Sequence, residues 1–301
     1  TAANPYTTKL GPPESAERRI NFSQSFNGLA WVIGPLIALY VYGNQSHVDG
    51  EKMISIILPF AIIGLVVLTV SFIFMRLKLP EITEDDEQTA HGGVKVKESN
   101  LEITDVKDPR YITKKPLWQN RHFKLGFFAQ ACYVAAQTGV FSFLINFVTD
   151  HDMHPRFELE YAPYFLSLGF LLFMIGRITG SALMKFFKPT NMLALYALMN
   201  CILLPVVAAE FGWISLISLY GVFFFMSLMF PTIFALAIKS LGSQTKQGAS
   251  FLVMAVAGGA IFPPLMGAVA DMYSMRIGFL VPIPLFAFIL YYALKGCQVQ
   301  E

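Results

Sequence analysis

Eight long apolar stretches dominate the sequence and limit what it can fold into. A helix needs about 20 predominantly apolar residues to cross a bilayer, where every backbone polar group must be satisfied within the segment. Of the 301 residues, 55% are hydrophobic and 14% are charged. The sequence therefore predicts an all-α polytopic membrane protein with eight transmembrane helices. The predicted spans cover residues 22–42, 54–75, 123–148, 161–184, 192–210, 213–238, 249–270 and 277–296.

Basic residues divide unequally between the loops on the two sides of this arrangement. With eight spans, 18 of the 22 Lys and Arg residues fall on one side, three fall on the other, and Arg177 lies inside a span. Because cytoplasmic loops carry the excess of Lys and Arg, the richer side is predicted to be cytoplasmic. Both ends of the chain and the 76–122 loop are on that side.

One long polar stretch, residues 76–122, separates the second span from the third. It contains the acidic run Glu84-Asp85-Asp86-Glu87 and little apolar periodicity, which favours a cytoplasmic linker. A regulatory docking site is the alternative. The predicted organisation is two helices in 1–75, the inter-domain loop 76–122 and a six-helix bundle in 123–301.

Polar and aromatic residues share one face of the third span. Gln130, Tyr133, Gln137 and Phe141 follow the spacing i, i+3, i+7 and i+11, which places them on one helical stripe. Amides offer donors and acceptors to hydroxyl groups, and aromatic rings cover the apolar face of a sugar. This stripe predicts a binding site for a neutral polyol. The alternative is hydrogen bonding between helices.

The first span carries a second polar set that we expect to bind the same ligand. Gln24 and Asn27 are three residues apart, and Trp31 follows Asn27 after four more. Arg177 is the only cation placed inside a span. It is expected to pair with helix carbonyls or to extend towards the membrane surface, with a structural or gating role rather than substrate contact.

Several spans contain residues that weaken a helix or allow close packing. Gly176 and Gly180 have the GxxxG spacing typical of helix–helix contact. Pro231 removes a backbone donor, and Gly258 and Gly259 permit a bend. We assign these residues, with Arg177, to structural or gating roles, while noting that Pro and Gly also occur in static membrane helices.

Catalysis and cofactor binding have no residues to support them in this sequence. It contains no Walker loop, dinucleotide-binding turn, HExxH or GxSxG motif, and the three cysteines lack metal-ligand spacing. The net charge of +2 argues against binding to nucleic acid. The chain is thus predicted to be neither an enzyme nor a cofactor protein.

Short motifs in the right order resemble the fucose permease-like sugar/proton symporters of the major facilitator superfamily. The first part of the chain resembles the region around that family's fourth and fifth helices, and later segments resemble its seventh, eighth, tenth and eleventh helices. These motifs are Asn4-Pro5-Tyr6, Leu10-Gly11-Pro12, Arg19-Ile20-Asn21, Gln24-Ser25-Phe26-Asn27, Tyr133-Val134-Ala135-Ala136-Gln137, Ile175-Gly176-Arg177-Ile178-Thr179-Gly180, Pro231-Thr232-Ile233-Phe234, Gly248, Ser250-Phe251-Leu252-Val253-Met254 and Gly258-Gly259.

The resemblance implies an incomplete major facilitator fold that contains helices five to twelve of twelve. It implies sugar contacts from Gln24, Asn27, Gln130, Tyr133 and Gln137, and it implies that the proton-coupling acids lie before Thr1, outside this chain. The predicted function is secondary transport of a hexose or 6-deoxyhexose (fucose, glucose or galactose type) by a monomer in a bacterial inner membrane. The alternative is a non-transporting sugar receptor or a structural helix bundle.

Overall fold

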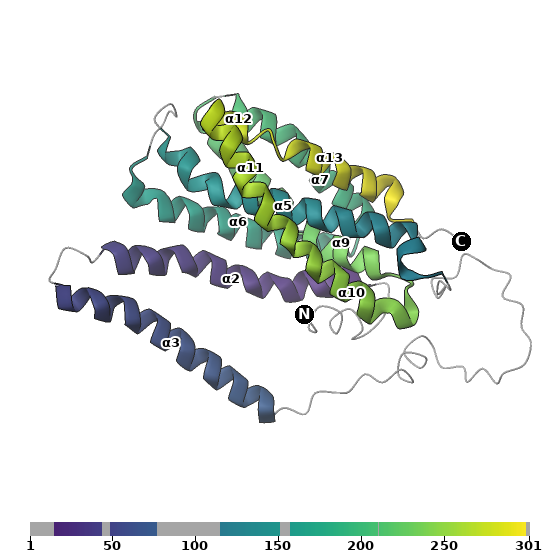
Figure 1. Cartoon of the computed structure of the whole chain (residues 1–301), viewed down its shortest axis with the longest axis horizontal. Helices are drawn as coiled ribbons and strands as arrows, with labels where there is room; N and C mark the ends of the chain where they lie inside the picture. The colour runs from purple at the N-terminus through teal and green to yellow at the C-terminus, as the bar shows by residue number, and fades with distance from the viewer. Residues whose placement is uncertain (1–14, 44–48, 77–114, 151–156, 210, 299–301) are drawn as a thin grey trace, which may run out of the picture.

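The computed structural model describes residues 15–43, 49–76, 115–150, 157–209 and 211–298. Within these ranges the regular structure is helical (Figure 1). The long helices are α2 (Ala16–Gly43), α3 (Asp49–Arg76), α5 (Arg121–Thr149), α6 (Ala162–Leu183), α7 (Pro189–Ala208), α8 (Trp213–Met226), α9 (Met229–Ile238), α10 (Thr245–Met254), α11 (Gly258–Met272) and α13 (Ile283–Tyr291). Short elements are η2 (Leu117–Gln119), η3 (Leu159–Tyr161), η4 (Gly242–Gln244), η5 (Ala255–Ala257), α12 (Met275–Gly278) and η6 (Tyr292–Gly296).

The helices match the predicted spans and confirm the all-α membrane fold. Seven helical stretches of the described chain are long and apolar enough to cross a bilayer. In α3 the corresponding apolar stretch, Phe60–Arg76, is shorter, so the eighth span stays a prediction. Helix α2 begins at Ala16, six residues before the predicted span. Its first turn carries Glu17, an acidic residue that suits a helix N-terminus.

Two predicted spans are broken rather than continuous. The span at 213–238 consists of α8 and α9, which are separated by a turn at Ser227 and Leu228. The span at 249–270 consists of α10 and α11, joined by the 3-10 turn η5. Hydropathy does not detect such breaks, because it measures side-chain polarity and not the backbone hydrogen-bond pattern.

Helix α5 lies at the centre of the bundle formed by the second part of the chain. It contacts α6, α9, α11 and α13 (Figure 1). Its buried positions include Phe123, Tyr133, Leu144 and Phe147, which belong to the core of the bundle. The bundle therefore fixes the direction in which the α5 polar stripe points.

Helix α2 packs along α6 and also contacts α9 (Figure 1). Its contact face includes Ile20, Asn21, Ser25 and Gly28. A Cβ atom added at Gly28 would lie 2.9 Å from Cβ of Met174, so glycine allows the two helices to approach closely. Helix α3 contacts α2, and its side chains from Phe60 to Arg76 are exposed.

Candidate functional site

One aromatic member of each predicted set, from α2 and from α5, takes part in a cluster of aromatic rings. The indole of Trp31 on α2 lies 5.7 Å, centroid to centroid, from the ring of Phe141 on α5. Phe141 in turn stacks on Phe223 of α8 at 4.7 Å. Phe170 and Phe173 of α6 complete the cluster, at 5.7 and 5.5 Å from Trp31.

Gln130 lies in the interior with both ends of its amide unpaired. Its side chain is fully buried, and neither Nε2 nor Oε1 has a hydrogen-bond partner in the described part of the chain. A buried amide without partners costs about 1–3 kcal/mol, so such groups usually bind water or a ligand. Within the α5 stripe, Gln130 is therefore the strongest candidate to hydrogen-bond a bound ligand.

Tyr133 is buried, and its hydroxyl is engaged with the backbone. The phenol donates a hydrogen bond of 3.1 Å to the carbonyl oxygen of Met226, at the end of α8. Its oxygen can still accept a hydrogen bond. Gln137 is 9% exposed, and the structure gives its amide no hydrogen bond to the described residues.

The α2 residues lie partly on a face that the described chain does not cover. Asn27 is exposed, Gln24 is half-buried and Trp31 is 38% exposed. Trp31 contacts Phe141 of the α5 stripe, whereas the Gln24 carbonyl accepts a hydrogen bond from Arg177 on α6. Asn27 is exposed and makes no hydrogen bond to α5 within the described part of the chain.

Arg177 is the only lysine or arginine of the described chain that is buried. Its Nε donates to the carbonyl of Ser227 at 2.7 Å, and Nη1 donates to the carbonyl of Gln24 at 2.9 Å. Its guanidinium carbon lies 4.8 Å from the centroid of the Phe173 ring, which adds a cation–π contact. Arg177 thus binds helix carbonyls, one of the two arrangements expected from the sequence.

Pro231 explains why the Ser227 carbonyl is available to Arg177. In an α-helix the carbonyl of residue i−4 accepts from the N–H of residue i, and proline has no N–H. The residue four positions before Pro231 is Ser227, which lies in the turn between α8 and α9. Arg177 supplies the donor that Pro231 lacks, and Tyr133 binds the preceding carbonyl, that of Met226.

The predicted glycines lie where helices approach most closely. A Cβ atom at Gly176 would be 2.5 Å from the carbonyl oxygen of Phe224, and one at Gly180 would be 2.7 Å from Leu228. A Cβ atom at Gly258 would lie 3.0 Å from the carbonyl of Ala131, and one at Gly259 would lie 2.6 Å from Thr138. These glycines bring α6 against α8 and α11 against α5.

Sequence reasoning missed a hydrogen bond between α2 and α9. In the sequence, Asn21 stood out only as part of a family motif. In the structure it is fully buried, and its Nδ2 donates to Oγ1 of Thr232 at 3.0 Å. Phe170, Phe173 and Phe223 were also missed. Their spacing in the sequence is typical of residues in a hydrophobic core. Their contacts with Trp31 and Phe141, which only the structure shows, connect them with the candidate site.

Comparison with known proteins identifies the fold family. The sequence profile described as Major Facilitator Superfamily matches residues 1–257. The chain belongs to the major facilitator superfamily. A major facilitator protein with these apolar helices is an integral membrane protein.

The major facilitator relatives include named sugar transporters. The chain is 34% identical over 300 residues to a glucose/galactose transporter of Brucella abortus, covering 99% of this chain and 68% of that protein. It is 34% identical over 311 residues to the L-fucose-proton symporter of Escherichia coli, covering 97% of this chain and 67% of the relative. A putative glucose/galactose transporter of Helicobacter pylori is 30% identical, with 71% of its length covered.

A solved major facilitator structure has the same arrangement of helices. The crystal structure of the E. coli fucose:proton symporter aligns with a TM-score of 0.78 at 31% identity, covering 99% of this chain and 73% of that one. A structure of the fucose transporter in the outward conformation aligns with a TM-score of 0.76 at 32% identity, with 72% of it covered. The resemblance to the fucose permease-like family is confirmed.

Proposed function

We propose that this protein is a secondary sugar transporter that moves a hexose or 6-deoxyhexose by alternating access. Its relatives are named as transporters of glucose, galactose and fucose, and none of the matches above is an enzyme. The single observation in this chain that carries the proposal is Gln130, whose amide is fully buried with both polar atoms unpaired. A sugar hydroxyl can accept from Nε2 and donate to Oε1.

The proposed substrate contacts come from both sets predicted from the sequence. Amides at Gln24, Asn27, Gln130 and Gln137 would bind hydroxyls, and Tyr133 would accept through its phenol oxygen. Trp31 and Phe141 lie in contact and offer an aromatic wall for the apolar face of a sugar ring. Transporters of this kind bind substrate near the midplane between two halves, which fits a site shared by α2 and α5.

Energy coupling and orientation complete the proposal. Two relatives are named as fucose-proton symporters, so we propose that transport uses the proton gradient. Residues 1–75 would contribute to one half and residues 123–301 would form the other, joined by the 76–122 loop. The excess of Lys and Arg on one side supports the proposal that this loop and both ends of the chain face the cytoplasm, with the protein in a bacterial inner membrane. The working unit would be a monomer.

Uptake into proteoliposomes tests the function directly. The protein expressed from its complete reading frame is reconstituted, and uptake of radiolabelled L-fucose, D-glucose and D-galactose is measured with and without an imposed pH gradient. We expect saturable accumulation of at least one sugar that the gradient stimulates. Binding without accumulation would indicate a receptor, and absence of both for all three sugars would refute the proposal.

Substitution of Gln130 tests the site. Gln130→Leu removes two unpaired buried polar atoms, so the apparent melting temperature should stay equal or rise, while sugar affinity should fall about tenfold or more. Asn200→Leu is the matched control, because Asn200 is also buried with an unpaired Oδ1 but lies on α7, away from the site. Unchanged sugar affinity in Gln130→Leu would show that Gln130 does not bind substrate.

A further inference from the structure

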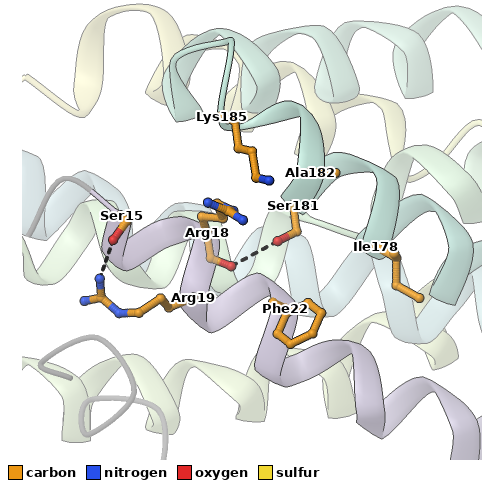
Figure 2. A pocket seen from close by; sticks show the side chains of 8 residues that line it. All are labelled: Ser15, Arg18, Arg19, Phe22, Ile178, Ser181, Ala182 and Lys185. Carbon is orange, nitrogen blue, oxygen red and sulfur yellow. Dashed lines mark hydrogen bonds between the residues drawn. The ribbon is translucent and has the colours of Figure 1, made fainter. Parts of the chain in front are cut away.

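A basic pocket lies between α2 and α6. It has a volume of about 370 Å³, and Figure 2 shows its lining side chains converging from the start of α2 and the end of α6. The lining residues are Ser15, Arg18, Arg19, Phe22, Ile178, Ser181, Ala182 and Lys185. Three of these residues are cationic, and none is acidic.

The pocket is held in shape by contacts between the two helices. Ser181 on α6 is buried, and its hydroxyl donates to the carbonyl oxygen of Arg18 on α2 at 3.1 Å. Arg19 donates from Nη1 to the hydroxyl of Ser15 (Figure 2). Arg18 and Ser181, 163 positions apart in the sequence, thus form the base of the pocket, which we call its floor.

Two exposed cations are directed towards the same space above this floor. The guanidinium of Arg18 and the ammonium of Lys185 lie on the same side of the pocket in Figure 2. Like charges that converge repel each other, and a bound anion reduces that repulsion. The buried carboxyl of Glu17 interacts with Arg19, whereas none of the residues that line the pocket is acidic. The charge of the pocket therefore selects a negatively charged group.

Apolar side chains extend the pocket in one direction only, towards the membrane interior. Phe22 lies one turn along α2 from Arg18, and Ile178 lies about two turns before Lys185 on α6. They are 56% and 44% exposed. Phe186 and Phe187, next to Lys185, are also exposed, as is typical of aromatic residues at the headgroup level. A ligand that fills the pocket needs an anionic head and an apolar tail.

We propose that this pocket binds the headgroup of an anionic phospholipid of the cytoplasmic leaflet, with its acyl chains along Phe22 and Ile178. Basic pockets between transmembrane helices on the cytoplasmic side are known to hold such headgroups. A free phosphate shares the charge but not the tail, and the apolar walls favour the lipid. The proposal does not depend on which substrate is transported.

Native mass spectrometry of the purified protein tests the proposal. The protein from its complete reading frame is titrated in detergent with dioleoylphosphatidylglycerol or dioleoylphosphatidylcholine, and the dissociation constant of the first bound lipid is measured. The anionic lipid should bind more tightly. In the double variant Arg18→Ala/Lys185→Ala its affinity should fall about 25-fold, at about fivefold for each cation.

A matched pair of cations separates this site from general surface charge. Lys124→Ala/Lys295→Ala removes two exposed lysines at the same end of other helices and should change the affinity by less than about twofold. Equal losses in the two double variants would overturn the proposal. If Arg18→Ala/Lys185→Ala does not fold, Arg18→Gln/Lys185→Gln is measured with the same criterion.

Two further measurements separate the lipid from free phosphate. Millimolar inorganic phosphate should fail to displace phosphatidylglycerol, and Phe22→Ser/Ile178→Ser should weaken its binding. Displacement by phosphate together with unchanged binding in the Phe22→Ser/Ile178→Ser variant would show that the pocket holds a soluble anion, and would refute the lipid assignment.

Discussion

Gly176→Ala should strongly destabilise the contact between α6 and α8. The added Cβ would lie 2.5 Å from the carbonyl oxygen of Phe224 and 2.7 Å from Oγ of Ser227. A carbon–oxygen contact needs about 3.3 Å, so the helices must separate by about 0.8 Å. The backbone oxygen cannot rotate away as a side chain can.

The separation would also break the adjacent hydrogen bond of Arg177. Its Nε lies 2.7 Å from the carbonyl oxygen of Ser227, and moving the helices apart by about 0.8 Å takes this distance beyond the hydrogen-bonding range. Overpacking costs about 1–3 kcal/mol, and a hydrogen bond between membrane helices is worth about 0.6–1.7 kcal/mol. The total cost is about 2–5 kcal/mol.

Thermal unfolding in detergent, followed by size-exclusion chromatography of heated samples, measures this cost. At about 2–4 °C for each kcal/mol, the apparent melting temperature should fall by about 4–20 °C. Gly34→Ala is the control, because a Cβ atom at Gly34 on α2 meets nothing within 4 Å in the described chain. A melting temperature for Gly176→Ala equal to those of the control and the wild type would refute the close-contact interpretation.

Three further substitutions probe the neighbouring hydrogen bonds. Tyr133→Phe removes the hydrogen bond to the Met226 carbonyl and should lower the free energy of unfolding by about 0.5–1.5 kcal/mol. In the same thermal assay its melting temperature should fall less than that of Gly176→Ala. A larger fall would contradict this expectation. Asn21→Ala removes the 3.0 Å hydrogen bond to Thr232 and should lower the free energy of unfolding by about 1 kcal/mol. Asn146→Ala, near the end of α5, is the control and should lower it less. The reverse order would exclude a structural role for Asn21. Arg177→Lys keeps the charge but cannot reproduce the planar donors that bind the carbonyls of Ser227 and Gln24, so sugar uptake in proteoliposomes should fall about tenfold; wild-type uptake would show that charge alone suffices.

Hydropathy and charge alone predicted the membrane fold and the approximate bounds of its helices. The aromatic contact between Trp31 and Phe141 was not predictable, because it depends on how two helices are rotated against each other. For Arg177 the sequence offered carbonyl pairing as one of two outcomes, and the structure supplies the partner. The sequence alone could have identified the Ser227 carbonyl as a candidate partner, because a proline in a helix leaves the carbonyl four residues earlier without its donor.

The roles of the site residues stay predictions, and the residues differ in how the structure surrounds them. Gln130 and Tyr133 are buried on α5, Tyr133 bonds the Met226 carbonyl at the end of α8, and the half-buried Phe141 stacks on Phe223 of α8. Asn27 lies on a face of α2 that the described chain leaves uncovered, so its role depends on contacts beyond these residues. Asn21 shows the limit of local reasoning: its partner Thr232 is 211 residues away, and no spacing rule connects them.

The pairing of Arg177 with the carbonyl freed by Pro231 makes the two positions energetically interdependent. A residue with an N–H at position 231 could close the helical bond to Ser227 by itself, and loss of the guanidinium would then leave fewer unsatisfied atoms. Their substitutions should therefore be non-additive, so that a family member lacking this proline could tolerate a neutral side chain at position 177. The proline at the start of α9 and the buried cation on α6 are expected to be gained or lost together.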